Sequence, residues 1–126
     1  MSEKPSGFVR SADTSKPFIA RDGATIFELL RPETSAVNNM SIASGSLESG
    51  QIARRHYHVV SEEAYYVVSG EGVAHVGEVS EPIKTGDVVH VPVGVVHGLE
   101  NVSSTDKMHI LAISSPPYSD DDIFFV

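Results

Sequence analysis

The sequence contains no cysteine, few basic residues and no long apolar run. Without cysteine, disulfide bonds, cysteine-ligated zinc and thiol catalysis are excluded, so any metal ligands have to be histidine, aspartate or glutamate. Lysine and arginine number nine against 17 acidic residues, which gives a formal net charge of −8. Nucleic acids and anionic membrane surfaces both require basic patches, and a bilayer requires a span of about 18 apolar residues. We therefore expect neither nucleic acid nor a membrane as a partner.

The organisation of the chain is simple. Its 126 residues, 40% of them apolar, suit one domain with a modest core, and no internal repeat or linker divides residues 1–126. The first residues, MSEKPSGFVRSAD, contain no apolar signal segment, so a cytoplasmic location is expected. Residues 1–17 are predicted to form a polar arm or an edge strand, and residues 114–126 a C-terminal extension. In that extension the acidic triplet Asp120–Asp122 is expected to be solvated, whereas the apolar end should pack on the domain or on a partner subunit.

Short β-branched and aromatic runs, separated by glycine, proline, serine and aspartate, dominate the sequence. Helical periodicity is nearly absent, and short, closely spaced strands predict an all-β sandwich or barrel. Turn residues in SGEG (69–72) and KTGD (84–87) are expected to close β-hairpins. The expected strands are 25–30, 40–47, 51–58, 64–68, 72–76, 83–84, 88–91, 95–102 and 107–113.

The segment RRHYHVVSEEAYYVVSG (54–70) carries the first candidate site. Side chains alternate along a strand, so His56 and His58 project to the same side, roughly 7 Å apart. An antiparallel return strand would bring its beginning, with Glu62 and Glu63, back towards the histidines. These two acids take opposite faces, so only one of them can join the site. His97, which follows the VPVG turn (91–94), is the next candidate ligand.

Three imidazoles and one carboxylate make a suitable donor set for a divalent first-row metal ion. Such a set leaves two of six octahedral positions for water or substrate, which is typical of catalytic rather than closed structural sites. Each signal also has an ordinary structural interpretation. A His-x-His pair on a strand often occurs without a metal, and an acidic pair beside a turn is usually solvated.

Ten positions with fixed spacing carry a resemblance to a known family. The pattern G-x5-H-x-H-x4-E-x6-G is matched by Gly50, His56, His58, Glu63 and Gly70. The pattern G-x5-P-x-G-x2-H-x3-N is matched by Gly86, Pro92, Gly94, His97 and Asn101. On these positions the chain resembles the small single-domain bacterial cupins.

The resemblance implies an all-β fold, the double-stranded β-helix or jelly-roll barrel of the cupins, with a metal-binding core over residues 50–101. It also implies one divalent transition metal as cofactor: Fe, Mn, Ni, Zn or Cu. The motif selects Glu63 rather than Glu62, because six residues separate Glu63 from Gly70. The implied metal ligands are His56, His58, Glu63 and His97.

Two further polar residues are candidates for contact with a substrate. Arg54 lies two residues before His56 and would face the barrel mouth, where it could bind an anion; if the strand starts nearer Arg55, Arg54 is simply exposed. Tyr65 shares the face of Glu63 and would serve as a hydrogen-bond donor or proton relay, or else as a core aromatic residue.

The remaining polar residues of the strands receive structural interpretations. His75 and His90 alternate with valine, which predicts a polar outer face. His109 is placed on the surface or in the core rather than in support of the metal. Asn101 is expected to tie down the loop that follows the His97 strand.

A divalent ion with one carboxylate ligand keeps a positive charge and favours bidentate oxygen ligands such as 2-oxo acids, enediolates, diketones and catecholates. We therefore expect a metal-dependent enzyme that acts on a small oxygenated, chelating metabolite, with dioxygenase chemistry favoured. The alternatives are a metal-dependent isomerase, epimerase or lyase, and a non-catalytic cupin that binds a small molecule.

The strand that begins at the acidic pair carries a second apolar face. Its residues Ala64, Tyr66 and Val68 are expected to form a stripe with Val73 or Ala74 that faces away from the metal. A second apolar face on a small barrel usually packs on another sheet or subunit, so a homodimer is expected.

Overall fold

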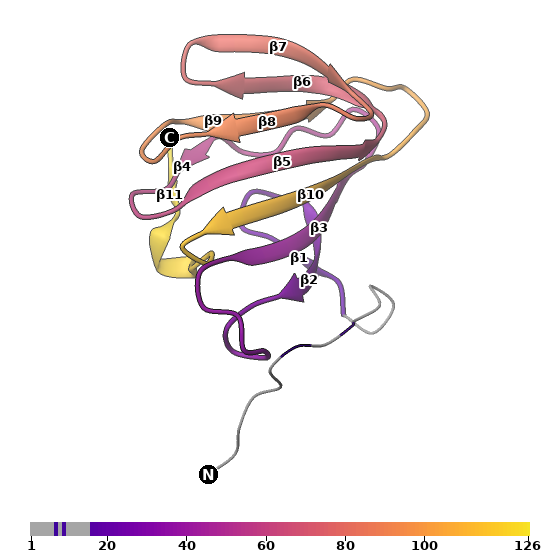
Figure 1. Cartoon of the computed structure of the whole chain (residues 1–126). Coiled ribbons are helices and arrows are strands. Elements are labelled where there is room, and N and C mark those ends of the chain that lie inside the picture. The colour runs from indigo at the N-terminus through magenta and orange to yellow at the C-terminus, as the bar shows by residue number, and fades with distance from the viewer. Residues whose placement is uncertain (1–6, 8, 10–15) are drawn as a thin grey trace.

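Two antiparallel β-sheets make up the structure, a computed structural model that describes residues 7, 9 and 16–126 (Figure 1). In the six-stranded sheet the order is β1 (Phe18–Ile19), β2 (Thr25–Leu30), β3 (Ser41–Leu47), β10 (Met108–Ser115), β5 (Glu62–Ser69) and β8 (Val88–Val91). In the five-stranded sheet it is β11 (Phe124–Phe125), β4 (His56–Tyr57), β9 (His97–Asn101), β6 (Glu71–Val76) and β7 (Val79–Lys84). A short 3-10 helix, η2 (Asp120–Asp122), precedes β11. This is the predicted jelly-roll arrangement.

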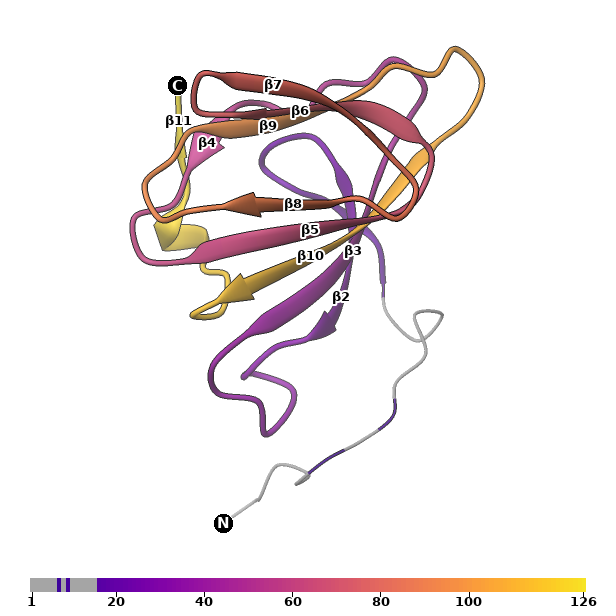
Figure 2. The same cartoon turned by 45° about the horizontal axis from the view of Figure 1, so that its top comes forward.

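The chain crosses from one sheet to the other between β5 and β6 and again between β7 and β8, which corrects both hairpin predictions. Gly70, with a φ of 103°, is the single residue between β5 and β6. Yet β5 pairs with β10 and β8, whereas β6 pairs with β7 and β9. The KTGD turn likewise leads from β7 to β8 in the opposite sheet. Turn residues predicted the reversals correctly, but they do not say whether the flanking strands pair with each other. Figure 2 shows the resulting separation of the two sheets.

Most expected strands are present, with differences that have local causes. β2 and β8 match their expected bounds, whereas the strand expected over 51–58 shrinks to β4 and an isolated bridge between Ile52 and Glu100. β7 begins at Val79 and is therefore longer than expected. Pro82 weakens the strand signal in the sequence, but β7 is an edge strand, where proline is tolerated. The two-residue strands β1 and β11 were not expected. The arm or edge strand proposed for residues 1–17 lies almost entirely outside the described residues.

Alternation along β5 separates the interior from the exterior, as predicted. Glu63, Tyr65 and Val67 are buried, whereas Tyr66 and Val68 are 42% and 45% exposed. The expected extension of the outer stripe into β6 is wrong. Ala74 belongs to the buried core and Val73 lies in the other sheet. The core between the sheets consists of Ala24, Leu47, Ala53, Tyr65, Val67, Ala74, Ile83, Val89, Val91, Leu99, Met108 and Ile110.

The connection between β1 and β2 is fastened to the segment that leads into β4. The Arg54 backbone amide donates to the Asp22 carbonyl at 2.8 Å, and the Gln51 side chain donates to the Gly23 carbonyl at 2.7 Å. These bonds join the β1–β2 connection to the chain segment that precedes His56. Among the described residues no helix is long and apolar enough to span a membrane.

Asn101, at the end of β9, anchors the loop beyond that strand, as predicted. Its side chain is buried, and its Oδ1 atom accepts from the Ser103 backbone amide at 3.0 Å. Its Nδ2 atom donates to the carbonyls of Leu47 at 3.0 Å, Glu48 at 3.1 Å and Asp106 at 2.8 Å.

We expect Asn101→Ala to lower the free energy of unfolding by about 2–4 kcal/mol, because it leaves several backbone groups without partners in a dry environment. Denaturant unfolding in the presence of a chelator measures this change. Ser49→Ala is the control, since it removes one exposed hydrogen bond to the Ser103 carbonyl in the same region and should cost less than about 1 kcal/mol. Equal losses in the two variants would contradict the anchoring role of Asn101.

Candidate metal centre

Four residues predicted as ligands come together between the sheets. His56 lies on β4 directly opposite His97 on β9, His58 follows β4, and Glu63 lies near the start of β5. One ligand atom from each lies within 4.8 Å of those of the other three, and all four residues are buried. The donor set is therefore brought together as expected. The expected pairing of the histidine strand with the glutamate strand is wrong, because β4 and β5 belong to opposite sheets.

Each of the three histidines has a backbone carbonyl beside its Nδ1 atom. A carbonyl oxygen can only accept a hydrogen bond, so these contacts assign the proton to Nδ1 and leave a lone pair on Nε2. This is the tautomer that ligates a metal through Nε2 while its other nitrogen is held by a hydrogen bond. The three contacts are His56 with Arg54 at 2.8 Å, His58 with Asp122 at 2.5 Å and His97 with Val95 at 3.0 Å.

The Nε2 atoms of His58 and His97 are buried and have no hydrogen-bond partner. Both lie close to Oε1 of Glu63, that of His97 at 3.4 Å. When the ring protons are on Nδ1, these lone pairs face a carboxylate oxygen with no positive charge between them, an arrangement that is unfavourable in a buried site. A cation bound among the four groups would remove this conflict, so the residues present fit a metal ion.

The electrostatic balance of the cluster favours an ionised glutamate. When protons on His58 and His97 take the place of a cation, the hydrogen bonds and positive charge of these rings outweigh burial, which by itself raises the pKa of Glu63, and lower that pKa to about 2. Burial lowers the pKa of His56 below its usual value. For His58, burial acts in the same direction, but the carboxylate of Glu63, to which a protonated ring would donate, leaves the pKa raised. One carboxylate and three imidazoles form a donor set that a divalent first-row ion accepts.

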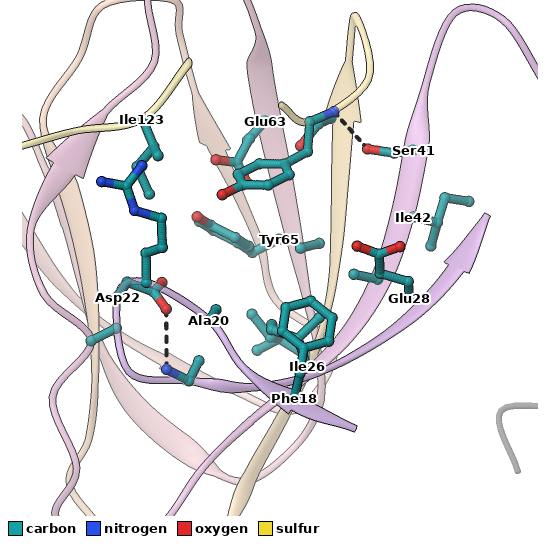
Figure 3. A pocket seen from close by; sticks show the side chains of 18 of the residues that line it. Phe18, Ala20, Asp22, Ile26, Glu28, Ser41, Ile42, Glu63, Tyr65 and Ile123 are labelled. Atoms are coloured by element: carbon teal, nitrogen blue, oxygen red, sulfur yellow. Dashed lines mark hydrogen bonds between the residues drawn. The ribbon is translucent and has the colours of Figure 1, made fainter. Parts of the chain in front are cut away.

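A cavity of about 590 Å³ begins at the cluster and extends outward along β2 and β3. His56, His58 and Glu63 line its inner end together with Tyr65. Figure 3 shows Glu63 at one end of this cavity, Tyr65 in the middle, and the apolar side chains of Phe18 and Ile26 at the other end. A molecule that fills the cavity would touch the cluster with one end and an apolar wall with the rest.

Tyr65 and Arg54 lie in different environments. Tyr65 is buried, its ring centroid is 6.0 Å from that of His97, and burial raises the pKa of its phenol well above the usual 10. Its hydroxyl therefore stays protonated at neutral pH. Arg54 is exposed and does not line the cavity; its guanidinium carbon lies 4.3 Å from the ring centroid of Phe125. Their roles towards a substrate stay predictions.

Several residues near the cluster were not expected from the sequence. The cavity lining includes Arg21, Asp22, Tyr118 and Ile123, which come from the two ends of the chain. Their positions follow from the packing of the termini, for which the motif spacing contains no signal.

Asp122 corrects the expectation that the whole acidic triplet is solvated. Asp120 and Asp121 are exposed, but Asp122 is only 7% exposed. Its carboxylate accepts hydrogen bonds from backbone amides of residues 59–61, and these bonds lower the pKa of Asp122 although burial opposes them. Three adjacent aspartates in the sequence do not reveal that only the third of them points inward.

The other histidines lie outside the cluster, as predicted. His90 is exposed and its Nε2 atom lies 2.9 Å from Glu62, the acid on the outer face. His75 contacts Ser80 at 2.7 Å and Glu100 at 3.1 Å across neighbouring strands. His109 is exposed on β10.

Comparison with known proteins agrees with the fold and the motifs. The family model for the cupin domain matches residues 44–114. An uncharacterised protein of Methanocaldococcus jannaschii is 34% identical over 110 residues, which is 87% of this chain and 87% of that protein. The chain therefore belongs to the cupin family. An oxalate-binding protein of Thermotoga maritima is 39% identical over 67 residues, covering 53% of this chain and 54% of the relative.

Solved structures share the same fold. A predicted oxalate decarboxylase of Thermotoga maritima has a TM-score of 0.77 and 26% identity, covering 86% of this chain and 99% of that chain. Pac13 of Streptomyces, described as a nucleoside dehydratase, has a TM-score of 0.74 and 21% identity, covering 96% and 92%. At this identity the likeness to Pac13 shows the fold alone.

The adjacent acids Glu62 and Glu63 offer a matched test of the metal centre. We expect Glu63→Gln to weaken the binding of a divalent metal by more than the 10- to 100-fold typical of residues that only support ligands. Glu62→Gln should leave it unchanged, because Glu62 is on the exposed outer face. Metal content after purification and competition with a chelator measure both. Equal metal affinities in the two variants would contradict the assignment of Glu63.

Proposed function

We propose that the protein is a metal-dependent cupin enzyme that acts on a small oxygenated metabolite able to chelate the metal. The observation that carries the proposal is the arrangement of three Nε2 lone pairs, set by the Nδ1 contacts, and one buried carboxylate at the inner end of a cavity. His56, His58, Glu63 and His97 would hold the ion. Its identity among Fe, Mn, Ni, Zn and Cu depends on availability as much as on the donor set.

The chemistry of such an ion is well defined. When bound, it supplies Lewis acidity and, if it is redox-active, a place for dioxygen to react beside a chelating substrate. The chain then has to hold the substrate and exclude competing water. We favour dioxygenase chemistry, because the protein then has only to hold the substrate and oxygen next to each other.

The cavity favours a substrate larger than its chelating group. Its volume of about 590 Å³ lies within the range of sites for ligands of drug size. The apolar side chains of Phe18, Ile26 and Ile42 would contact an aromatic or aliphatic body. The name of the oxalate-binding relative supports a chelating group in the substrate, because oxalate presents two adjacent carboxylates to a metal.

Tyr65 is the side chain that we assign to substrate orientation. Its phenol lines the cavity and stays protonated, so it would donate a hydrogen bond to a substrate oxygen rather than remove a proton. Arg54 packs over Phe125 outside the cavity lining. A contribution of Arg54 would therefore be limited to the effect of its positive charge at a distance.

Oxygen consumption tests the proposed reaction. We expect Fe²⁺-loaded protein to consume oxygen with at least one member of a panel of diketones, catechols and flavonols. Glu63→Gln should abolish this activity and Glu62→Gln should retain it. Tyr65→Phe should retain the metal and lose most of the turnover, because only the phenolic hydroxyl is removed.

The other outcomes distinguish the alternatives. Turnover of an oxo acid or a sugar without oxygen consumption would replace the dioxygenase by an isomerase, epimerase or lyase. Tight binding of a panel member with no turnover under either condition would indicate a non-catalytic binding cupin. A protein that binds neither metal nor any of these compounds would contradict the proposal as a whole.

We also propose that the protein forms a homodimer through the outer face of β5 and β8. Tyr66 lies opposite Val88 on β8 and Leu111 on β10, and Tyr66, Val68 and Val88 are 42%, 45% and 65% exposed. Apolar side chains grouped on one sheet face are typical of subunit contacts.

Light scattering at micromolar concentration checks the dimer. We expect a mass twice the 13.5 kDa of the chain for the wild type and a single chain for Tyr66→Glu, since a charge would be buried in the contact. Val79→Glu, on an exposed site of β7 in the other sheet, is the control and should stay dimeric. A monomeric wild type would contradict the proposal.

A further inference from the structure

We propose that Asp122 is a positioning residue for the metal centre, and that the C-terminal segment of η2 and β11 acts as a clamp that holds His58 in place. This inference rests on the proposed metal-binding function. Figure 1 shows the segment, in yellow, passing beside β4. None of its residues belongs to the two cupin motifs, which end at Asn101.

The carboxylate of Asp122 caps the turn that joins two of the ligands. Residues 59–61 are the first residues of the link between His58 and Glu63. Consecutive amides pointing at one carboxylate form a concave anion site, which fixes the backbone that makes it. The bonds are from Val59 at 2.8 Å and Val60 at 3.0 Å to Oδ1, and from Val60 at 3.2 Å and Ser61 at 3.0 Å to Oδ2.

The backbone of Asp122 acts on the ligand itself. Its carbonyl accepts the Nδ1 proton of His58 at 2.5 Å. For His56 and His97 the accepting carbonyl lies only two residues earlier in the chain. His58 alone among the three depends on a group 64 residues away in sequence. Its orientation is therefore set by the docking of the C-terminal segment.

Further contacts hold the segment against the barrel. The Ser61 hydroxyl donates to the Pro116 carbonyl at 2.7 Å, and the Val126 amide donates to the Arg55 carbonyl at 3.3 Å. Beyond η2, Phe125 pairs with His56, another of the ligands. Metal binding and docking of the segment therefore favour each other, because both require the same orientation of His58.

Asp122→Asn tests this role against Asp121→Asn, which removes the same charge from the exposed neighbour. We expect Asp122→Asn to weaken Zn²⁺ and Co²⁺ binding by about 10- to 100-fold, because the amide NH₂ group cannot accept from the turn. Asp121→Asn should bind within twofold of the wild type. Competition with a chelator measures the affinities, and unfolding of the metal-free proteins measures stability separately.

The absorption spectrum of the Co²⁺-loaded protein separates positioning from a general effect on folding. At saturating Co²⁺ we expect altered visible bands in Asp122→Asn and wild-type bands in Asp121→Asn. A residue that only stabilised the fold would leave the bands of the bound ion unchanged.

Hydrogen exchange of the wild type decides the question if Asp122→Asn does not fold. Saturating Zn²⁺ should slow exchange of the amides of residues 59–61 more than that of Thr105 and Asp106. These control amides bond to the Ser103 hydroxyl in the turn beyond the opposite end of β9.

The outcomes separate this inference from the proposed function. Wild-type protein that binds no metal would overturn both. Wild-type protein that binds metal, with the same affinity and the same Co²⁺ bands in Asp122→Asn, would overturn the positioning role and leave the metal centre standing. Exchange at residues 59–61 that is unaffected by Zn²⁺ would overturn the positioning role as well.

Discussion

The structure around the site depends on one buried carboxylate faced by imidazole nitrogens. Glu63 is 6% exposed and lies among three histidines whose Nδ1 atoms are engaged by backbone carbonyls. An ionised group in such a place is costly unless positive charge accompanies it. The cluster therefore favours a bound cation. The carbonyl contacts keep the Nε2 lone pairs directed at the position that this cation would occupy.

The crossing of strands between sheets makes this convergence possible. β4 and β9 bring His56 and His97 from one sheet, while β5 brings Glu63 from the other. At Gly72, just after the chain has crossed, a Cβ atom would lie 2.2 Å from the Glu100 carbonyl oxygen. The absence of a side chain there permits β6 and β9 to pair closely at the end of β9 away from His97.

The two ends of the chain complete the surroundings of the cluster. The segment before β2 contributes Phe18 and Arg21 to the cavity, and the C-terminal segment contributes Tyr118 and Ile123. The motif residues therefore define the chemistry at the inner end of the cavity. The terminal segments form part of its walls, together with β2, β3 and β10.

The sequence by itself determined the fold family, the four ligand candidates and the choice of Glu63 over Glu62, because motif spacing and the alternation of side chains along a strand are local properties. The same alternation placed Tyr65 inside and Tyr66 outside. Only the tertiary structure decided that the turns near Gly70 and Gly86 lead to different sheets, and that Asp122 is buried while its neighbours are exposed. Strand pairing and the docking of a terminal segment depend on contacts between residues far apart in the chain, and a single sequence does not record which of the available contacts is made.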